Sequence, residues 1–126
     1  MAYVNKKTVN TYTPMLEFKF ERQANAAILR IESSMLTALH NTTILAQLDA
    51  IIQEGHNHLV VVLSGVQYMN SSGLSLLVSC HTKTSKAGGK AILCNVPASV
   101  NTLLDITKLH SILEQEQTLE AALARF

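Results

Sequence analysis

Hydrophobic and polar residues alternate along this chain with two different periods, which predict strands and helices. Glu17–Glu21 alternates strictly, as in a strand with one solvent-exposed face. Ala26–Ile31 is more apolar, so a more central strand is expected there. Leu59–Leu63 is a continuous β-branched and apolar run, typical of a strand covered on both faces. Lys90–Cys94 predicts another strand, and a brief one is expected around Ile112–Leu113.

Four further segments carry apolar residues at the spacing of a helix that is buried along one side. The first follows the capping residues Asn41–Thr43 and stops at Gly55, and the second ends before Gly88–Gly89. The third begins after Pro97, and the fourth is capped by Thr118. The apolar stripes are Ile44, Leu45, Leu48, Ile51 and Ile52; Leu74, Leu77, Val78 and His81; Val100, Leu103 and Leu104; and Leu119, Ala122, Leu123 and Phe126.

The order of these elements defines the fold class. It runs strand, strand, helix, strand, helix, strand, helix, strand, helix, and helices between buried strands indicate crossover connections. We therefore predict one α/β domain with a mixed, mostly parallel β-sheet and helices packed against it. Residues 16–126 are assigned to this domain and residues 1–15 to an N-terminal tail. Ser33–His40 is either a loop or an early turn of the first helix.

Composition narrows the classes of partner. The chain has 126 residues, of which 48% are hydrophobic and 15% charged, and its formal net charge is +1. This balance gives no electrostatic reason to expect nucleic acid or an anionic membrane as the main partner. No apolar run has the length of a signal peptide or a membrane span, so we expect a cytoplasmic protein without membrane insertion. Cys80 and Cys94 are expected to be buried free thiols.

Asn70–Leu74 is the segment with the clearest chemical potential. It follows the buried strand Leu59–Leu63 and the connection Ser64–Met69, and it opens the second helix. Two hydroxyls and a glycine would then lie at a helix N-terminus, where free N–H groups and the helix dipole stabilise an anion. A serine here is a helix cap, a ligand for an anion, or a phosphorylation site, and position alone does not choose among these.

Residues from about 58 to 125 resemble the STAS domain of the anti-sigma-factor antagonists. That family has a buried strand followed by aspartate, serine, serine or threonine, glycine and leucine, which corresponds to Leu59–Leu74 here. The resemblance continues through the helix end and strand at Lys86–Cys94 and through the apolar-Leu-Asp-apolar pattern within Val100–Leu113. The first strands and helix fit the same layout more loosely.

The resemblance implies a protein-binding switch without catalytic activity, cofactor or metal of its own. In this family the first serine of the motif is phosphorylated by an anti-sigma factor that is also an ATP-dependent serine kinase. The unphosphorylated antagonist binds this kinase and frees its sigma factor, and a serine phosphatase resets the cycle. Carried onto this chain, the acceptor is Ser71, with Ser72 as the alternative, and Asn70, Ser71, Ser72, Gly73 and Leu74 form the partner-binding motif. Gly73 is expected to let the partner approach the backbone closely.

The chain departs from the family pattern at two places. Asn70 replaces the usual aspartate, which keeps the capping ability but removes a negative charge beside the acceptor. Ser33–Ala38 stands where the family has a loop of glycine, an acidic residue, leucine and aspartate. These departures favour the alternative of a non-switching STAS module, either a scaffold of a signalling assembly or an accessory subunit of a transporter.

Other chemistry finds little support in the sequence. Gly73–Leu77 resembles the nucleophile elbow of hydrolases but lacks its final glycine. His56, His58 and the cysteines lack the spacing of metal ligands, and they are interpreted as surface histidines and core thiols. Leu103, Leu104 and Ile106 are expected in the core, although relatives of this family use the corresponding helix for partner contacts.

Overall fold

The computed structural model describes residues 18–23, 26–36 and 41–126, so the predicted tail 1–15 lies outside the described residues. Its elements, in chain order, are β2 (Phe18–Arg22), β3 (Ala27–Ile31), β4 (Met35–Leu36), α1 (Asn41–Gln53), β5 (Leu59–Val62), β6 (Tyr68–Met69), α2 (Ser71–Lys86), β7 (Ala91–Cys94), α3 (Ala98–Thr107), the 3-10 helix η2 (Leu109–Ser111), β8 (Glu114–Glu116) and α4 (Leu119–Leu123). Short strands β4 and β6 and helix η2 were not predicted.

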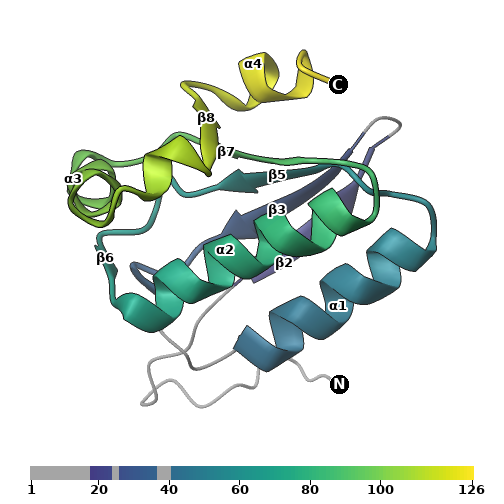
Figure 1. The fold of residues 1–126 in the computed structure, drawn as a ribbon, viewed down its shortest axis with the longest axis horizontal. Coiled ribbons are helices and arrows are strands. Elements are labelled where there is room, and N and C mark those ends of the chain that lie inside the picture. Colours follow the sequence, from purple (N-terminus) through teal and green to yellow (C-terminus); the bar gives the residue numbers. More distant parts are fainter. Residues whose placement is uncertain (1–17, 24–25, 37–40) are drawn as a thin grey trace.

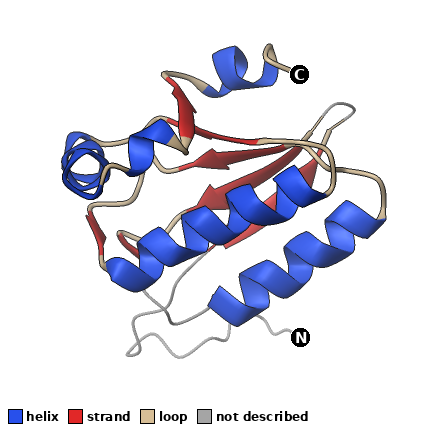
Figure 2. Ribbon diagram, viewed as in Figure 1, coloured by secondary structure: helices blue, strands red, loops and turns tan. Residues whose placement is uncertain are grey.

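The main sheet confirms the predicted α/β class. It has five strands in the order β2-β3-β5-β7-β8, and β2 is antiparallel to β3 while the other neighbours are parallel. In the register of the central strands, Val61 lies beside Leu29 on one side and Leu93 on the other. Figure 2 shows this sheet behind the two long helices. The opening hairpin therefore makes an otherwise parallel sheet mixed.

Helices cover the two faces of the sheet unequally. Helices α1 and α2 lie side by side over one face, with α3 beyond the β6 end of α2 (Figure 1). The larger of two hydrophobic cores lies between these helices and the sheet, and it contains Leu29, Val61 and Leu93. Successive strand residues face opposite sides, so Val60 and Ile92 point the other way, where α4 packs. A fully buried aliphatic side chain stabilises the fold by about 1.5–3 kcal/mol. The core under α1 and α2 has more such side chains, so it contributes more to stability than the core under α4.

The buried stripe of α2 differs from the predicted one. Leu74 and Leu77 are buried as expected, but Val78 and His81 are only half-buried. Cys80 and Thr84 are buried in their place. Thr84 is polar, yet its hydroxyl donates to the carbonyl oxygens of Cys80 at 2.9 Å and His81 at 3.1 Å. A polar residue can be buried when its hydroxyl is hydrogen-bonded. The prediction followed the spacing of apolar residues, so it did not include Thr84 in the buried face of α2.

The last strand also lies later than predicted. A strand was expected around Ile112–Leu113, but β8 comprises Glu114–Glu116, and Ile112 is 44% exposed. β8 is one of the two edge strands of the main sheet and pairs with β7 through its backbone. Its half-exposed polar side chains therefore give no hydrophobic signal. Of residues 112–116, only Leu113, just before the strand, is buried.

Glycines end both long helices as expected. Gly55 follows α1 with φ +104°, and Gly88 follows α2 with φ +86°. A Cβ atom at Gly89 would overlap the carbonyl oxygen of Asn57, so this position requires glycine for a different, steric reason. Asn41–Thr43 was expected to precede the first helix, but these residues form its first turn.

The two cysteines are buried free thiols, as predicted. Burial raises the pKa of Cys80 to about 12 and the pKa of Cys94 to about 11. Because the thiolate is the reactive form, both side chains are chemically inert near neutral pH.

Candidate functional site

The first turn of α2 is built around an asparagine cap. Asn70 has extended backbone angles (φ −101°, ψ −173°), and its Oδ1 accepts a hydrogen bond from the Gly73 N–H at 3.0 Å. The Leu74 N–H donates to the Asn70 carbonyl oxygen at 3.1 Å. Asn70 is thus the N-cap, a use that the sequence left open for Ser71. The N–H groups of Ser71 and Ser72 have no acceptor within the helix.

The motif residues differ in their exposure. Ser71 is exposed and Ser72 is half-buried, whereas Gly73 and Leu74 are buried. The structure therefore brings only Asn70, Ser71 and Ser72 to the surface as a group. Leu74 is 8% exposed and belongs to the core.

Gly73 faces the interior of the protein. A Cβ atom at this position would lie 2.5 Å from the Leu36 carbonyl oxygen and 2.5 Å from Cγ of Met69. The absent side chain makes room for strands β4 and β6 of the same chain. Internal packing is thus one reason for a glycine at this position, and the close approach of a partner to Gly73 stays a prediction.

Strands β4 and β6 form a small parallel sheet beneath the motif, which the sequence did not reveal. Met35 pairs with Tyr68 and Leu36 with Met69. The Leu36 carbonyl oxygen accepts a hydrogen bond from the Asn70 N–H at 3.4 Å. Two-residue strands are too short to show any periodicity. The exposed residue of each strand is Met35 in β4 and Tyr68 in β6, with accessibilities of 51% and 53%. Tyr68 precedes the motif by two residues, and Met35 is its neighbour in the small sheet.

The electrostatics of this helix start favour an anion. No acidic residue lies in the first turn of α2, and Lys83 and Lys86 lie in its last turn. The positive end of the helix dipole and two N–H groups without an acceptor in their own helix lie at Ser71 and Ser72. A phosphoryl group on Ser71 would meet no like charge within its own turn.

Replacing Asn70 tests the cap directly. We expect Asn70→Ala to lower the free energy of unfolding by about 1 kcal/mol because the Gly73 N–H loses its acceptor. Asn70→Asp, the matched control, should keep nearly all of the stability because a carboxylate oxygen accepts the same bond. Urea unfolding monitored by circular dichroism measures both. Equal stability of Asn70→Ala and the wild type would show that this bond contributes nothing.

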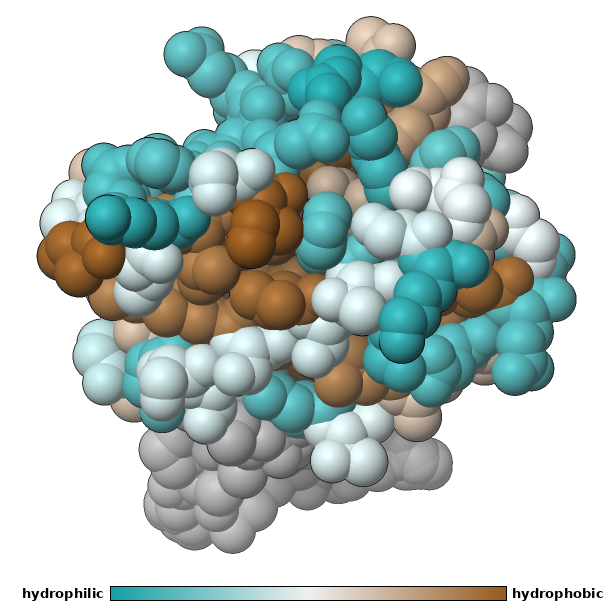
Figure 3. All heavy atoms as spheres, in the orientation of Figure 1, coloured by the Kyte–Doolittle hydropathy of each residue, from teal (hydrophilic) through white to brown (hydrophobic). Residues whose placement is uncertain are grey.

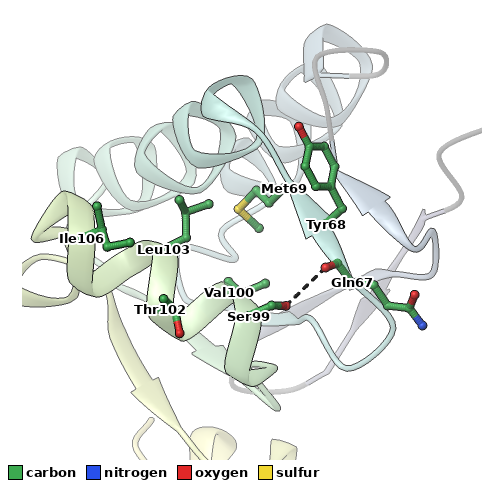
Figure 4. A pocket seen from close by; sticks show the side chains of 8 residues that line it. All are labelled: Gln67, Tyr68, Met69, Ser99, Val100, Thr102, Leu103 and Ile106. Atoms are coloured by element: carbon green, nitrogen blue, oxygen red, sulfur yellow. Dashed lines mark hydrogen bonds between the residues drawn. The ribbon is translucent and has the colours of Figure 1, made fainter.

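An apolar groove lies beside the motif, between β6 and α3. Its volume is about 210 Å³, and it is lined by Gln67, Tyr68, Met69, Ser99, Val100, Thr102, Leu103 and Ile106 (Figure 4). The Ser99 hydroxyl donates to the Gln67 carbonyl oxygen at 3.3 Å across one end. Small-molecule pockets usually exceed about 300 Å³, so this groove suits one or two side chains of a protein partner.

Ile106 corrects the expectation that this part of α3 is core. Leu104 is buried, but Ile106 is 72% exposed, and the half-buried Leu103 lines the groove together with Ile106. Figure 3 shows the resulting hydrophobic surface, coloured brown, extending from α3 toward α2. Ile106 lines the groove together with Tyr68, which precedes the exposed Ser71 by three residues and pairs with the exposed Met35. We call Met35, Tyr68, Leu103 and Ile106 the apolar rim.

The other predicted ligands do not assemble into a site. Within residues 18–23, 26–36 and 41–126, no group of three or more His, Cys, Asp or Glu side chains is placed to hold a metal ion. His58 instead stacks on Phe126, with ring centroids 4.5 Å apart. Among the described helices, none is both long and apolar enough to span a bilayer.

Comparison with known proteins establishes the family. The family model of the STAS domain matches residues 17–122, and this chain therefore belongs to the STAS domain family. An anti-sigma F factor antagonist of Paenibacillus polymyxa is 29% identical over 101 residues, covering 78% of this chain and 84% of that protein.

Solved structures share the fold. The anti-sigma factor antagonist SpoIIAA in its unphosphorylated form matches with a TM-score of 0.74 at 20% identity, covering 86% of this chain and 95% of the SpoIIAA chain.

 The phosphorylated form of SpoIIAA from Bacillus matches with a TM-score of 0.68 at 21% identity, covering 86% of this chain and 98% of that chain. The murine anion transporter Slc26a9 matches with a TM-score of 0.64 at 19% identity, covering 83% of this chain but 18% of the transporter. At these identities the likeness shows the fold alone.

Proposed function

We propose that this chain is an anti-sigma-factor antagonist whose binding is switched by phosphorylation of Ser71. The observation that carries the proposal is an exposed serine at the first position of α2, directly after the Asn70 cap and within a STAS domain. The partner is an anti-sigma factor that is also an ATP-dependent serine kinase. A serine phosphatase removes the phosphoryl group and restores binding.

Exposure supports Ser71 over Ser72 as the acceptor. A kinase must bring its ATP in line with the attacking hydroxyl, which requires an accessible side chain. Ser71 is exposed, whereas Ser72 is half-buried and its carbonyl oxygen accepts a hydrogen bond from Nδ2 of Asn41 at 3.1 Å. Ser72 is therefore the less suitable acceptor.

The surroundings of Ser71 explain how one phosphoryl group would act as a switch. In the free protein the group's charge of about −1.5 to −2 is stabilised by the helix N-terminus, so the fold need not change. In a complex, the same group would be pressed against a partner that covers the apolar rim. An unpaired dianion is costly to desolvate there. Phosphorylation would therefore weaken binding without unfolding the antagonist.

Mapping the phosphorylation site tests this function. The wild-type chain is used to capture its partner kinase from the cells that express it, and the purified pair is incubated with ATP and Mg²⁺. Mass spectrometry should find one phosphoryl group on Ser71, absent in Ser71→Ala and retained in Ser72→Ala. Phosphorylation on neither serine would contradict the proposed switch.

The apolar rim should contribute to binding independently of phosphorylation. We expect Ile106→Ser to weaken kinase binding about tenfold, because burying this exposed side chain in an interface is worth about 1.5 kcal/mol or more. Its thermal unfolding should not change, since Ile106 is 72% exposed in the free chain. Ile112→Ser is the matched control, because Ile112 is also exposed but does not line the groove. Affinity is measured by calorimetric titration. Equal affinities for the two variants would show that α3 is not part of the interface.

The alternative function is a STAS module that binds without switching, as a scaffold or an accessory subunit of a transporter. Asn70, the residues 33–38 and the shared fold of Slc26a9 favour it. Under this alternative, a negative charge at Ser71 leaves partner binding unchanged, and the captured partner is a membrane transporter or a signalling assembly without kinase activity.

A further inference from the structure

The exposed Ser71 lies between two anchored neighbours. On one side, the Asn70 N–H donates to the Leu36 carbonyl oxygen at 3.4 Å. On the other, the Ser72 carbonyl oxygen accepts from Nδ2 of Asn41 at 3.1 Å. The first contact is long for a hydrogen bond and the second is of ordinary length. Asn41 therefore provides the firmer of the two anchors.

The Asn41 contact is a link between helices. Asn41 is the first residue of α1, and the Ser72 carbonyl oxygen belongs to the first turn of α2. That oxygen has a second lone pair besides the one used in its own helix, so it can accept both bonds. Further along the same pair of helices, Nζ of Lys83 lies 2.9 Å from Oδ1 of Asp49. Of these two links between α1 and α2, the Asn41 contact is the one that reaches the serine motif.

The chemistry of the side chain makes Asn41 specific for this role. Only Nδ2 of an asparagine can donate to a carbonyl oxygen, and a carboxylate in its place would accept only. Oδ1 of Asn41 is buried and accepts no hydrogen bond from the described residues, so the amide is held by its Nδ2 contact. An aspartate would bring its charged oxygen against the Ser72 carbonyl.

We propose that Asn41 is a positioning residue for phosphorylation of Ser71, an inference that rests on the proposed function. By holding the Ser72 carbonyl, it fixes the peptide unit between Ser72 and Gly73, one residue beyond the acceptor, and so the first turn of α2 that carries the Ser71 hydroxyl. Phosphoryl transfer depends almost entirely on placing the attacking oxygen in line with the γ-phosphate of ATP. A displacement of about 1 Å reduces such a rate by up to about 100-fold. Asn41 thus acts on the rate of transfer and makes no contact with ATP itself.

Two variants and one control test this role. Asn41→Asp is nearly isosteric, removes the donor, and places an acidic residue in the first turn of α1, where the helix dipole favours it. Asn41→Ala removes the side chain altogether. Asp49→Ala is the matched control, because it cuts the other polar link between α1 and α2 without touching the motif. The kinase captured with the wild-type chain phosphorylates each variant under single-turnover conditions, and its binding is titrated separately.

We expect both Asn41 variants to be phosphorylated at least about tenfold more slowly at saturating kinase, with unchanged affinity, while Asp49→Ala matches the wild type. Hydrogen exchange of the amides at 71–73 should be faster in Asn41→Asp, and exchange at 80–86 should not change. Wild-type transfer rates in both variants would overturn the inference, as would a loss of affinity that accounts for the slower rate. No transfer to the wild-type chain would instead refute the proposed function, and the positioning role with it.

Discussion

Replacing Gly73 with alanine should destabilise the domain by about 1–3 kcal/mol, the usual cost of overpacking a tightly packed interior. The new Cβ atom would lie 2.5 Å from the Leu36 carbonyl oxygen and 3.2 Å from its carbonyl carbon. These are backbone atoms of β4, so they cannot move aside as the end of a flexible side chain would. The small sheet beneath the motif must shift, and the cap at Asn70 shifts with it. Urea unfolding measures the loss.

Gly65→Ala is the matched control for this prediction. A Cβ atom at Gly65 would meet its nearest neighbours, the carbonyl oxygens of Ile31 and Glu32, at 3.7 and 3.8 Å, which is ordinary contact. We expect this variant to stay within about 0.5 kcal/mol of the wild type, as most substitutions that create no clash do. If Gly73→Ala were as stable as Gly65→Ala, the packing of α2 against β4 would not be as close as the structure shows.

Introducing a negative charge at Ser71 should have the largest effect on binding. We expect Ser71→Asp to bind the kinase at least about tenfold more weakly, because a buried unpaired charge costs several kcal/mol in an interface. Ser71→Ala should bind like the wild type, since it removes only a hydroxyl. Isothermal titration with the unmodified kinase compares the two variants.

Ser75→Asp separates the position of the charge from its presence. Ser75 is exposed one turn further along α2 and lies outside the motif. A loss of binding confined to Ser71→Asp would place the sensitive point at the helix start. Equal losses in both variants would indicate a general repulsion of charge, and no loss in either would favour the non-switching module.

The main architecture could be predicted because burial leaves a strong pattern. The central strands β5 and β7 are apolar at every position, and Gly55 and Gly88 mark the helix ends. Edge strand β8 was misplaced because its side chains are all polar and are held by backbone pairing with β7 and by polar contacts, which leave no hydrophobic pattern. The burial of Thr84 in α2 was not predicted for a related reason: it is polar, and its hydroxyl is hydrogen-bonded within the helix.

The site was predictable only in part. The Asn-Ser-Ser-Gly stretch marks the start of a helix, and its position after a buried strand indicated where an anion would be stabilised. The sequence did not show that β4 and β6 pair beneath it, or that Asn41 reaches it from another helix. Both contacts join residues about thirty positions apart, and local patterns do not encode such pairings. The exposure of Ile106 was missed because an apolar residue in a helix normally indicates the core.

Release of the sigma factor is the most direct measurement of the central claim. The chain, either unmodified or phosphorylated on Ser71, is titrated into a complex of the captured anti-sigma factor and its sigma factor, and free sigma factor is quantified. The unmodified chain should release sigma factor in proportion to the amount added, and the phosphorylated chain should release little or none at the same concentrations. Equal release by the two forms would contradict a switch at Ser71.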